Sequence, residues 1–237
     1  MPSLSARISP LLQLTRAALV FTAISDSFAE LLLRGRFAAT RSAIDTGGLH
    51  PLHFASIALV SAGLYGFGMS LNDIIDRRRD EQPAADRPLP RGRMGVATAH
   101  MIAAGCALVA LAGGTWYAAM VSEGWKSLAL VVWTAVLITF YDAVGKYLVW
   151  PGLVTLGLIR LFHSVAPAPQ MPLIWHPLLL FNHVTILSTI AYYWEEKRPA
   201  LTRAHLWAVI GWVAIVNGAI VSLAIWRRTP RFGDISN

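Results

Sequence analysis

The sequence predicts an all-α protein, a polytopic transmembrane bundle of about seven helices, and three observations support this fold class. Hydrophobic residues make up 55% of the 237 residues, and the mean hydropathy is +0.52. Charged residues contribute only 14%, whereas a soluble domain carries about 25%. Long stretches of the chain hold no charge at all. This composition excludes an ordinary soluble enzyme and a disordered protein, and the single cysteine, Cys106, excludes a disulfide scaffold.

Seven segments are apolar enough to cross a bilayer, whose core of about 30 Å needs roughly 20 residues per helix. We expect them to form one transmembrane domain over residues 1–237. The first is expected to be a retained helix rather than a signal peptide, because Asp26 and Glu30 lie inside it and no clear cleavage site follows. The expected helices cover about residues 15–33, 52–76, 95–121, 125–144, 150–167, 174–194 and 204–226.

Basic residues give the chain a formal net charge of +7 and lie mainly between the apolar segments. In that position they meet lipid headgroups or anionic substrates, so nucleic acid is not an expected partner. Alternate loops divide the Lys and Arg residues 12 to 7, with Arg34, Arg36 and Arg41 in a loop on the poorer side. The positive-inside rule then places the N-terminus in the cytoplasm. A bacterial inner membrane is the expected location.

The second predicted helix ends in an acidic motif, Asn72-Asp73-Ile74-Ile75-Asp76-Arg77-Arg78-Arg79-Asp80. On a helix, Asp73, Asp76 and Asp80 fall within about 60° of one another. Three carboxylates on one stripe repel one another unless a cation lies between them, and Mg²⁺ prefers such oxygen ligands together with substrate phosphates. The motif therefore predicts a magnesium site at the membrane surface. The alternative is a solvated charge cluster beside the membrane.

A basic, turn-forming segment follows, Asp86-Arg87-Pro88-Leu89-Pro90-Arg91-Gly92. The two motifs, N-D-x-x-D-x-x-x-D and D-R-P-L-P-x-G, resemble those of the UbiA superfamily of intramembrane aromatic prenyltransferases, of the 4-hydroxybenzoate polyprenyltransferase type. The resemblance implies a helical fold around a central cavity. It also implies Mg²⁺-dependent transfer of a polyprenyl group from its diphosphate to a lipid-soluble, often aromatic acceptor, through an allylic carbocation. Asn72 and Arg87 would bind the substrate.

The resemblance extends from about Leu11 to Arg203. Leu14-Thr15-Arg16 and Gly157-Leu158-Ile159-Arg160 match the family in order, so Arg16 is expected to bind substrate, and Arg160 to bind the diphosphate or an acceptor carboxylate. After the sixth helix the family has D-x-x-x-D, where this chain offers only Glu195 and Glu196. These glutamates are expected to complete a second magnesium site. An interfacial cluster within an aromatic belt is the alternative.

The fourth predicted helix ends in Tyr141-Asp142-Ala143-Val144-Gly145-Lys146, at the family's Y-x-x-x-K position. The spacing differs by one, so either Tyr141 or Asp142 replaces the family tyrosine. The resemblance places Lys146 on the leaving diphosphate. A simple i,i+4 ion pair between Asp142 and Lys146 is the alternative. The expected catalytic residues are therefore Asp73, Asp76, Asp80, Lys146 and Arg160.

Two rival functions remain. A catalytically degenerate family member would bind prenyl lipids or assemble with partners without turnover, which the incomplete second acidic motif favours. A transporter would use the intramembrane residues Asp26, Glu30 and Arg160 to line a path, but it leaves both motifs unexplained. Asp26 and Glu30 are otherwise expected to contact the acceptor or to pair with Arg160. Family members usually have nine helices, so we expect an oligomer or a partner subunit to replace the last two.

Overall fold

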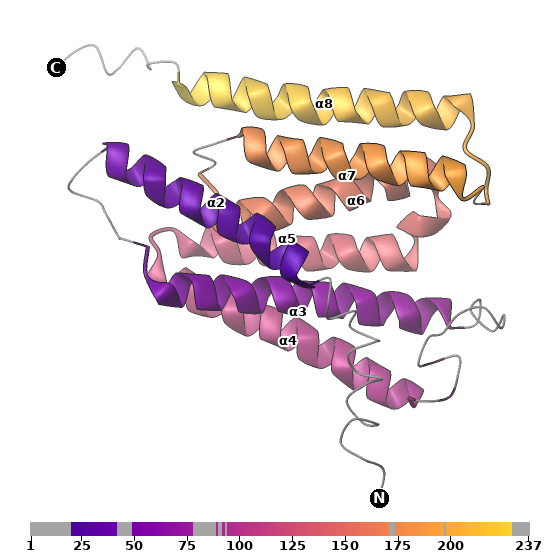
Figure 1. The fold of residues 1–237 in the computed structure, drawn as a ribbon, viewed down its shortest axis with the longest axis horizontal. Helices are drawn as coiled ribbons and strands as arrows, with labels where there is room; N and C mark the ends of the chain where they lie inside the picture. Colours follow the sequence, from indigo (N-terminus) through magenta and orange to yellow (C-terminus); the bar gives the residue numbers. More distant parts are fainter. Residues whose placement is uncertain are drawn as a thin grey trace, which may run out of the picture. The chain divides into compact units, whose positions relative to one another are not determined.

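The computed structural model describes residues 20–41, 49–77, 89, 92, 94–170, 174–196 and 198–228. All regular structure in these ranges is helical, which confirms the predicted fold class. The described residues form seven α-helices and one short 3-10 helix, and Figure 1 shows how the α-helices are arranged along the chain. They are α2 (Val20–Arg41), α3 (Pro51–Asp76), α4 (Val96–Met120), α5 (Gly124–Ala143), η2 (Gly145–Tyr147), α6 (Val149–Val165), α7 (Trp175–Trp194) and α8 (Arg203–Arg228).

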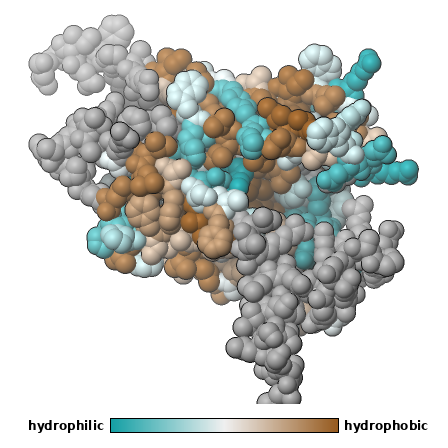
Figure 2. Space-filling view, in the orientation of Figure 1, coloured by the Kyte–Doolittle hydropathy of each residue, from teal (hydrophilic) through white to brown (hydrophobic). Residues whose placement is uncertain are grey.

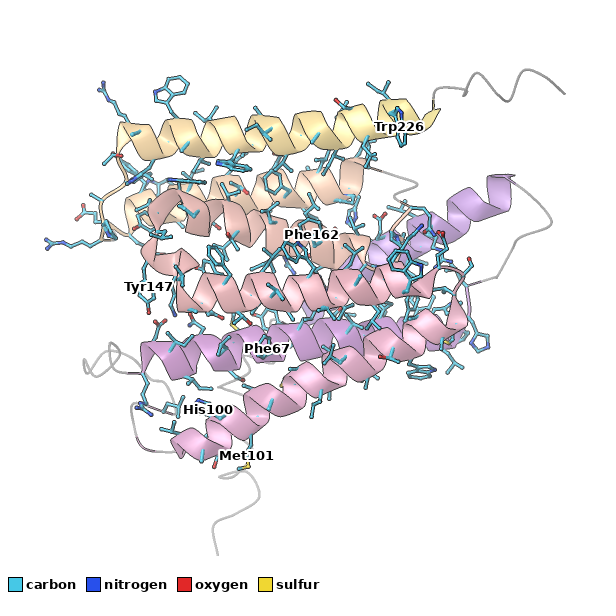
Figure 3. All side chains as sticks on the ribbon, turned by 180° about the vertical axis from the view of Figure 1, so that it is seen from behind. Phe67, His100, Met101, Tyr147, Phe162 and Trp226 are labelled. Carbon is cyan, nitrogen blue, oxygen red and sulfur yellow. The ribbon has the colours of Figure 1, made fainter. Side chains whose placement is uncertain are left out.

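Within the described residues, four helices are long and apolar enough to cross a membrane: α3, α4, α5 and residues Arg203–Trp226 of α8. The helix α6 is apolar but shorter, with 17 residues. Large hydrophobic side chains cover much of the surface shown in Figure 2. Met101 and Trp226, which project outward in Figure 3, are 66% and 62% exposed. Exposing these apolar side chains to water would be unfavourable, whereas lipid accommodates them, so this surface is typical of a membrane protein.

The chain divides into two compact units. The first comprises Met1–Val144 and Phe162–Pro172, and the second comprises Gly145–Leu161 and Leu173–Asn237. The first unit thus holds α2, α3, α4, α5 and the last four residues of α6. The second holds η2, the rest of α6, α7 and α8.

Close backbone packing of α3 against α4 organises the first unit (Figure 1). A Cβ atom added to Gly63 would lie 2.5 Å from the backbone nitrogen of Ala110, and one on Gly113 would lie 2.8 Å from the carbonyl oxygen of Ser56. Only a residue without a side chain permits this approach, which is the usual way in which membrane helices associate. The helix α2 also packs on α3, where Phe28 and Phe54 meet edge to face at 5.0 Å.

In the second unit, α7 and α8 run side by side (Figure 1). Asn182 and Asn217 exchange two amide hydrogen bonds between these helices, at 2.9 and 2.8 Å. Trp150 of α6 stacks on Trp212 of α8, with ring centroids 6.0 Å apart. Apolar stacking and one amide pair therefore hold the three helices of this unit together.

The structure corrects the sequence prediction at Arg34, Arg36 and Arg41, which were assigned to a loop. All three belong to α2, which continues to Arg41. The side chain of Arg34 is half-buried and donates hydrogen bonds to the Tyr117 hydroxyl and the Pro167 carbonyl, at 2.5 and 3.3 Å. These tertiary contacts hold the guanidinium within the first unit, so the charge does not end the helix.

Candidate functional site

The acidic motif lies in the last turns of α3, at the end of the first unit. Asp73 is buried, with 3% of its surface exposed, while Asn72 and Asp76 are half-buried. Residues three apart on a helix differ by about 60° in direction, so Asp73 and Asp76 share one side of α3. Burying carboxylates at the end of an apolar helix is costly unless a partner compensates their charge. Such placement is typical of a functional site rather than a solvated face.

The end of α5 supplies further polar groups to this region. The helix α5 packs against α3, and Tyr141 lies within electrostatic range of both Asp76 and Asp142. Asp142 is also buried, with 3% exposed. Five of the predicted residues, Asn72, Asp73, Asp76, Tyr141 and Asp142, therefore gather where α3 and α5 end. The structure thus places a further buried carboxylate, that of Asp142, near the end of α5, which packs against α3.

The chemistry of these side chains fits a magnesium ion. Carboxylate and amide oxygens are hard ligands, and Mg²⁺ is typically held by one or two protein carboxylates, with waters and substrate phosphates completing its shell. Asp73 and Asp76 provide two such carboxylates on one side of α3. No group of three or more acidic, histidine or cysteine side chains able to hold a metal occurs among the residues that the structure describes. Any metal bound there would therefore depend on substrate or water oxygens, or on residues outside the described ranges.

Three predicted site residues, Arg16, Asp80 and Arg87, lie outside the described residues. Four others belong to the second unit. Lys146 lies in the short helix η2, with its ammonium group 5.6 Å from the ring centre of Tyr147. Arg160 is half-buried on α6. Glu195 and Glu196, the remaining two, are both exposed in the turn that follows Trp194.

Two features of the backbone bear on these residues. The helix α5 ends at Ala143, and Val144 has a φ of −135°, so Asp142 and Lys146 do not share a helix and the i,i+4 spacing loses its meaning. Glu195 is the cap of α7, and Glu196 has a left-handed φ of 47°. The side-chain directions of these two glutamates therefore cannot be derived from the geometry of α7.

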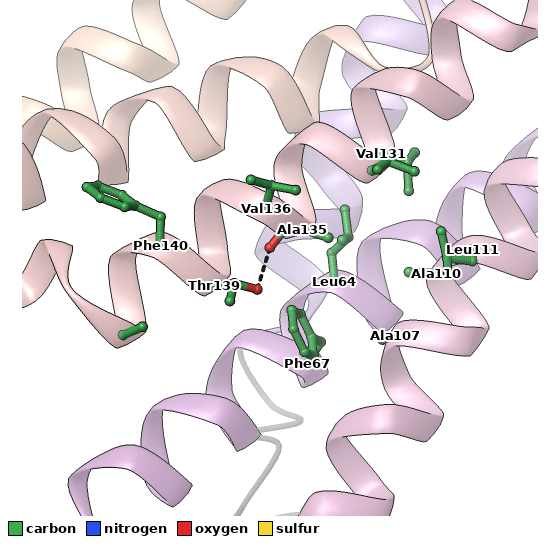
Figure 4. Close-up of a pocket in the computed structure, with 12 residues that line it drawn as sticks. Leu64, Phe67, Ala107, Ala110, Leu111, Val131, Ala135, Val136, Thr139 and Phe140 are labelled. Carbon is green, nitrogen blue, oxygen red and sulfur yellow. Dashed lines mark hydrogen bonds between the residues drawn. The ribbon is translucent and has the colours of Figure 1, made fainter.

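An apolar groove opens between α3, α4 and α5 in the first unit (Figure 4). Its volume is about 490 Å³, and small and aliphatic side chains dominate its lining. The hydroxyl of Thr139 donates to the carbonyl of Ala135 in its own helix, at 2.9 Å, so it offers little polarity to the groove. Leu64, which lines the groove, is nine residues from Asp73 and so faces the opposite side of α3.

Sequence reasoning missed a buried polar cluster that joins α2, α3 and α6 within the first unit. The Ser61 hydroxyl donates to Ser27 at 3.1 Å, and the His163 Nε2 lies 3.2 Å from Ser27 and 3.0 Å from Ser61. All three side chains are at least 96% buried. Glu30, one turn further along α2, is completely buried. The i,i+4 spacing of Asp26, Glu30 and Arg34 was the signal that α2 carries a polar, inward face.

Comparisons with known proteins agree with the fold. The sequence model described as the UbiA prenyltransferase family matches residues 37–201. A solved structure of digeranylgeranylglyceryl phosphate synthase is similar, with a TM-score of 0.67 and 18% identity, over 92% of this chain and 78% of the other. A UbiA homologue from Archaeoglobus fulgidus, bound to DMAPP and Mg²⁺, has a TM-score of 0.62 and 16% identity, over 94% and 80% of the two chains. A comparison with curated protein sequences gave no match.

Proposed function

Because the chain belongs to the UbiA prenyltransferase family, we propose that it transfers a polyprenyl group from a prenyl diphosphate to a lipid-soluble, aromatic acceptor within the membrane. The observation that carries this proposal is the burial of Asp73 and Asp142 near the ends of α3 and α5, where Tyr141 lies within electrostatic range of both Asp76 and Asp142. Carboxylate oxygens are hard ligands that suit Mg²⁺, and a Mg²⁺ held by one or two carboxylates typically also binds substrate phosphates.

The residues of the first unit would act mainly by holding charge in place. Asp73 and Asp76 would ligate Mg²⁺, with Asn72 and Asp142 close to them. When bound, Mg²⁺ neutralises the charge that develops on the leaving pyrophosphate. In the proposed reaction, the C–O bond between the prenyl group and the diphosphate breaks toward an allylic carbocation. The electron-rich acceptor then forms the new bond and loses a proton.

The apolar surroundings would protect this reaction. Water quenches an allylic cation, and an active site within lipid keeps water away. Roles for Lys146, Arg160, Glu195 and Glu196, and for Arg16, Asp80 and Arg87, follow from the family resemblance and stay predictions. The expected setting is likewise a proposal, namely a bacterial inner membrane with the acidic motif on the cytoplasmic side.

The deciding experiment uses membranes from cells that express the full chain. Labelled prenyl diphosphates of several lengths are added with and without Mg²⁺, and the lipid products are extracted. We expect a Mg²⁺-dependent product that Asp73→Asn reduces about a hundredfold or more. Glu123→Gln is the matched control, because it also removes one carboxylate but lies in the exposed turn between α4 and α5. Equal amounts of each variant in the membrane are confirmed by immunoblot.

The same experiment separates the proposal from its rival. A degenerate family member would retain labelled prenyl diphosphate on the purified protein and form no product with any acceptor. Full activity of Asp73→Asn in excess Mg²⁺ would remove Asp73 from the metal site. Neither binding nor product with any prenyl length would contradict both functions.

A further inference from the structure

A second polar site lies in the first unit, at the opposite end of α3 from the aspartates. Arg34, Tyr117, His53 and His50 form a continuous series of contacts there. Arg34 donates to the Tyr117 hydroxyl at 2.5 Å, Tyr117 meets the His53 ring edge to face at 5.8 Å, and the His53 and His50 rings are 6.3 Å apart. His53 and Asp73 are twenty residues apart, about 30 Å along the helix axis. This cluster is therefore distinct from the candidate prenyl transfer site.

Backbone hydrogen bonds determine which ring nitrogen of His50 and of His53 carries the proton. The Nδ1 of His50 accepts from the Leu52 backbone N–H at 3.2 Å, and the Nδ1 of His53 accepts from the His50 backbone N–H at 3.2 Å. A ring nitrogen that accepts a hydrogen bond carries no proton, so the proton of the neutral ring is on Nε2. Both rings therefore present an Nε2–H donor even when they are uncharged.

The charge of Arg34 is positioned by neutral groups. Its Nη1 donates to the Tyr117 hydroxyl and to the Pro167 carbonyl, and Tyr117 in turn donates to the same carbonyl at 2.6 Å. A guanidinium has five N–H donors, so three remain after these two bonds. Among the described residues, the structure gives Arg34 no carboxylate partner.

The start of α3 adds positive potential to the cluster. His50 is the N-cap of this 26-residue helix, and the N-terminus of a helix attracts anions through its dipole and unpaired N–H groups. The first residue of a membrane-crossing helix lies at the depth of the lipid headgroups. The phosphate of a phospholipid is the anion present at that depth, and Leu49 and Leu52 are exposed beside it for the acyl chains.

We propose that Arg34, His50 and His53 form a binding site for the phosphate of a phospholipid headgroup, at the end of the first unit opposite the aspartates. The guanidinium provides the charge, the two imidazole Nε2–H groups provide further donors, and buried Tyr117 holds Arg34 in place. The site would fix one lipid against α2 and α3.

Titration calorimetry tests this proposal on the purified full chain in neutral detergent. The probe is dioctanoyl phosphatidylglycerol, and EDTA removes metal-dependent binding of phosphate at the aspartates. We expect Arg34→Gln to weaken binding about tenfold, the loss of one charge-assisted contact. His50→Gln, which keeps a side-chain acceptor at the N-cap of α3, should weaken binding about threefold.

Lys126→Gln is the matched control. Lys126 is a cation at the same end of the first unit, but it pairs with Glu123 at 2.7 Å and thereby lowers the pKa of that carboxyl. Its charge is already compensated, so its removal should leave lipid binding unchanged. Circular dichroism checks that each variant keeps its helices.

Each other outcome overturns the proposal. Unchanged binding in both Arg34→Gln and His50→Gln removes these residues from any lipid site. An equal loss in Lys126→Gln indicates general attraction by positive charge. Equally tight binding of dioctanoylglycerol, which has no phosphate, assigns the binding to the acyl chains. Equally tight binding of inorganic phosphate indicates a site for a free anion.

Discussion

The side-chain amides of Asn182 and Asn217 hydrogen-bond to each other twice and so link α7 to α8. Each amide serves as donor once and as acceptor once. Asn217 also donates to the Val213 carbonyl in its own helix, at 2.7 Å, which fixes its orientation. A reciprocal amide pair satisfies polar groups that lipid cannot solvate, so it specifies how α8 is rotated against α7.

Asn182→Ala should reduce the free energy of unfolding by about 1 kcal/mol, as found for hydrogen bonds between membrane helices. Asn217→Ala should cost a similar amount, because it breaks the same pair. The measurement is unfolding in increasing dodecyl sulfate, followed by circular dichroism. The double variant should lose little more than either single one, and strictly additive losses would show that the two amides act independently.

Gly63→Ala should destabilise the first unit by about 1–3 kcal/mol, because the new methyl group would meet the backbone of α4, which cannot move aside as a side chain can. The temperature of half-unfolding in detergent measures the loss. Gly105→Ala is the matched control, since a Cβ atom there meets nothing within 4 Å. That change should be neutral or stabilise the helix by up to about 1 kcal/mol. A loss as large as that of Gly63→Ala would refute the packing argument.

The sequence predicts the fold class and several helix ends because apolar runs and helix signals are local. Pro51 suits the first turn of a helix, and α3 begins there, one residue before the expected start at residue 52. The first helix differs more at its end, which was expected at residue 33 and lies at Arg41. Hydropathy counts Arg34 as a terminating charge, whereas the folded chain supplies Tyr117 and Pro167 as its partners. Those partners are distant in sequence and leave no local signal.

The same contrast between local signals and contacts of distant residues applies to the candidate site. The spacing of Asp73 and Asp76 indicates a shared helix face, and this relation holds because α3 runs through both residues. The spacing of Asp142 and Lys146 suggested the same relation, which fails because the helix ends between them. Ser61 and His163 are 102 residues apart, so their contact depends wholly on how the helices pack. Helical periodicity predicts neighbours only while the helix continues.

Ser61→Ala should lower the free energy of unfolding by about 1–2 kcal/mol. It removes a hydroxyl that makes two buried hydrogen bonds, so Ser27 and His163 each lose one partner. Thermal unfolding monitored by tryptophan fluorescence gives the difference. Thr115→Val is the control, since this exposed hydroxyl only donates to the Leu111 carbonyl in its own helix. A smaller effect for Ser61→Ala than for Thr115→Val would show that the buried cluster does not hold α2, α3 and α6 together.

Asp142→Asn should raise the Mg²⁺ concentration needed to stabilise the protein in the presence of a non-hydrolysable prenyl diphosphate analogue. Ligand binding stabilises the folded protein by RT ln(1 + [L]/Kd), so thermal shifts across a Mg²⁺ titration report the apparent affinity. We expect a shift of about tenfold, equivalent to roughly 1.4 kcal/mol, because Asp142 is a buried carboxylate next to Tyr141, which lies within electrostatic range of Asp76. Glu123→Gln removes a carboxylate at the other end of the same helix, where it is exposed, and should leave the titration unchanged. Superimposable curves for Asp142→Asn and the unmodified chain would exclude Asp142 from the metal site. A shift of the Mg²⁺ titration in Asp142→Asn, but not in Glu123→Gln, would establish that α5 contributes charge to the site. The position of Asp142 four residues before Lys146 does not by itself imply this contribution.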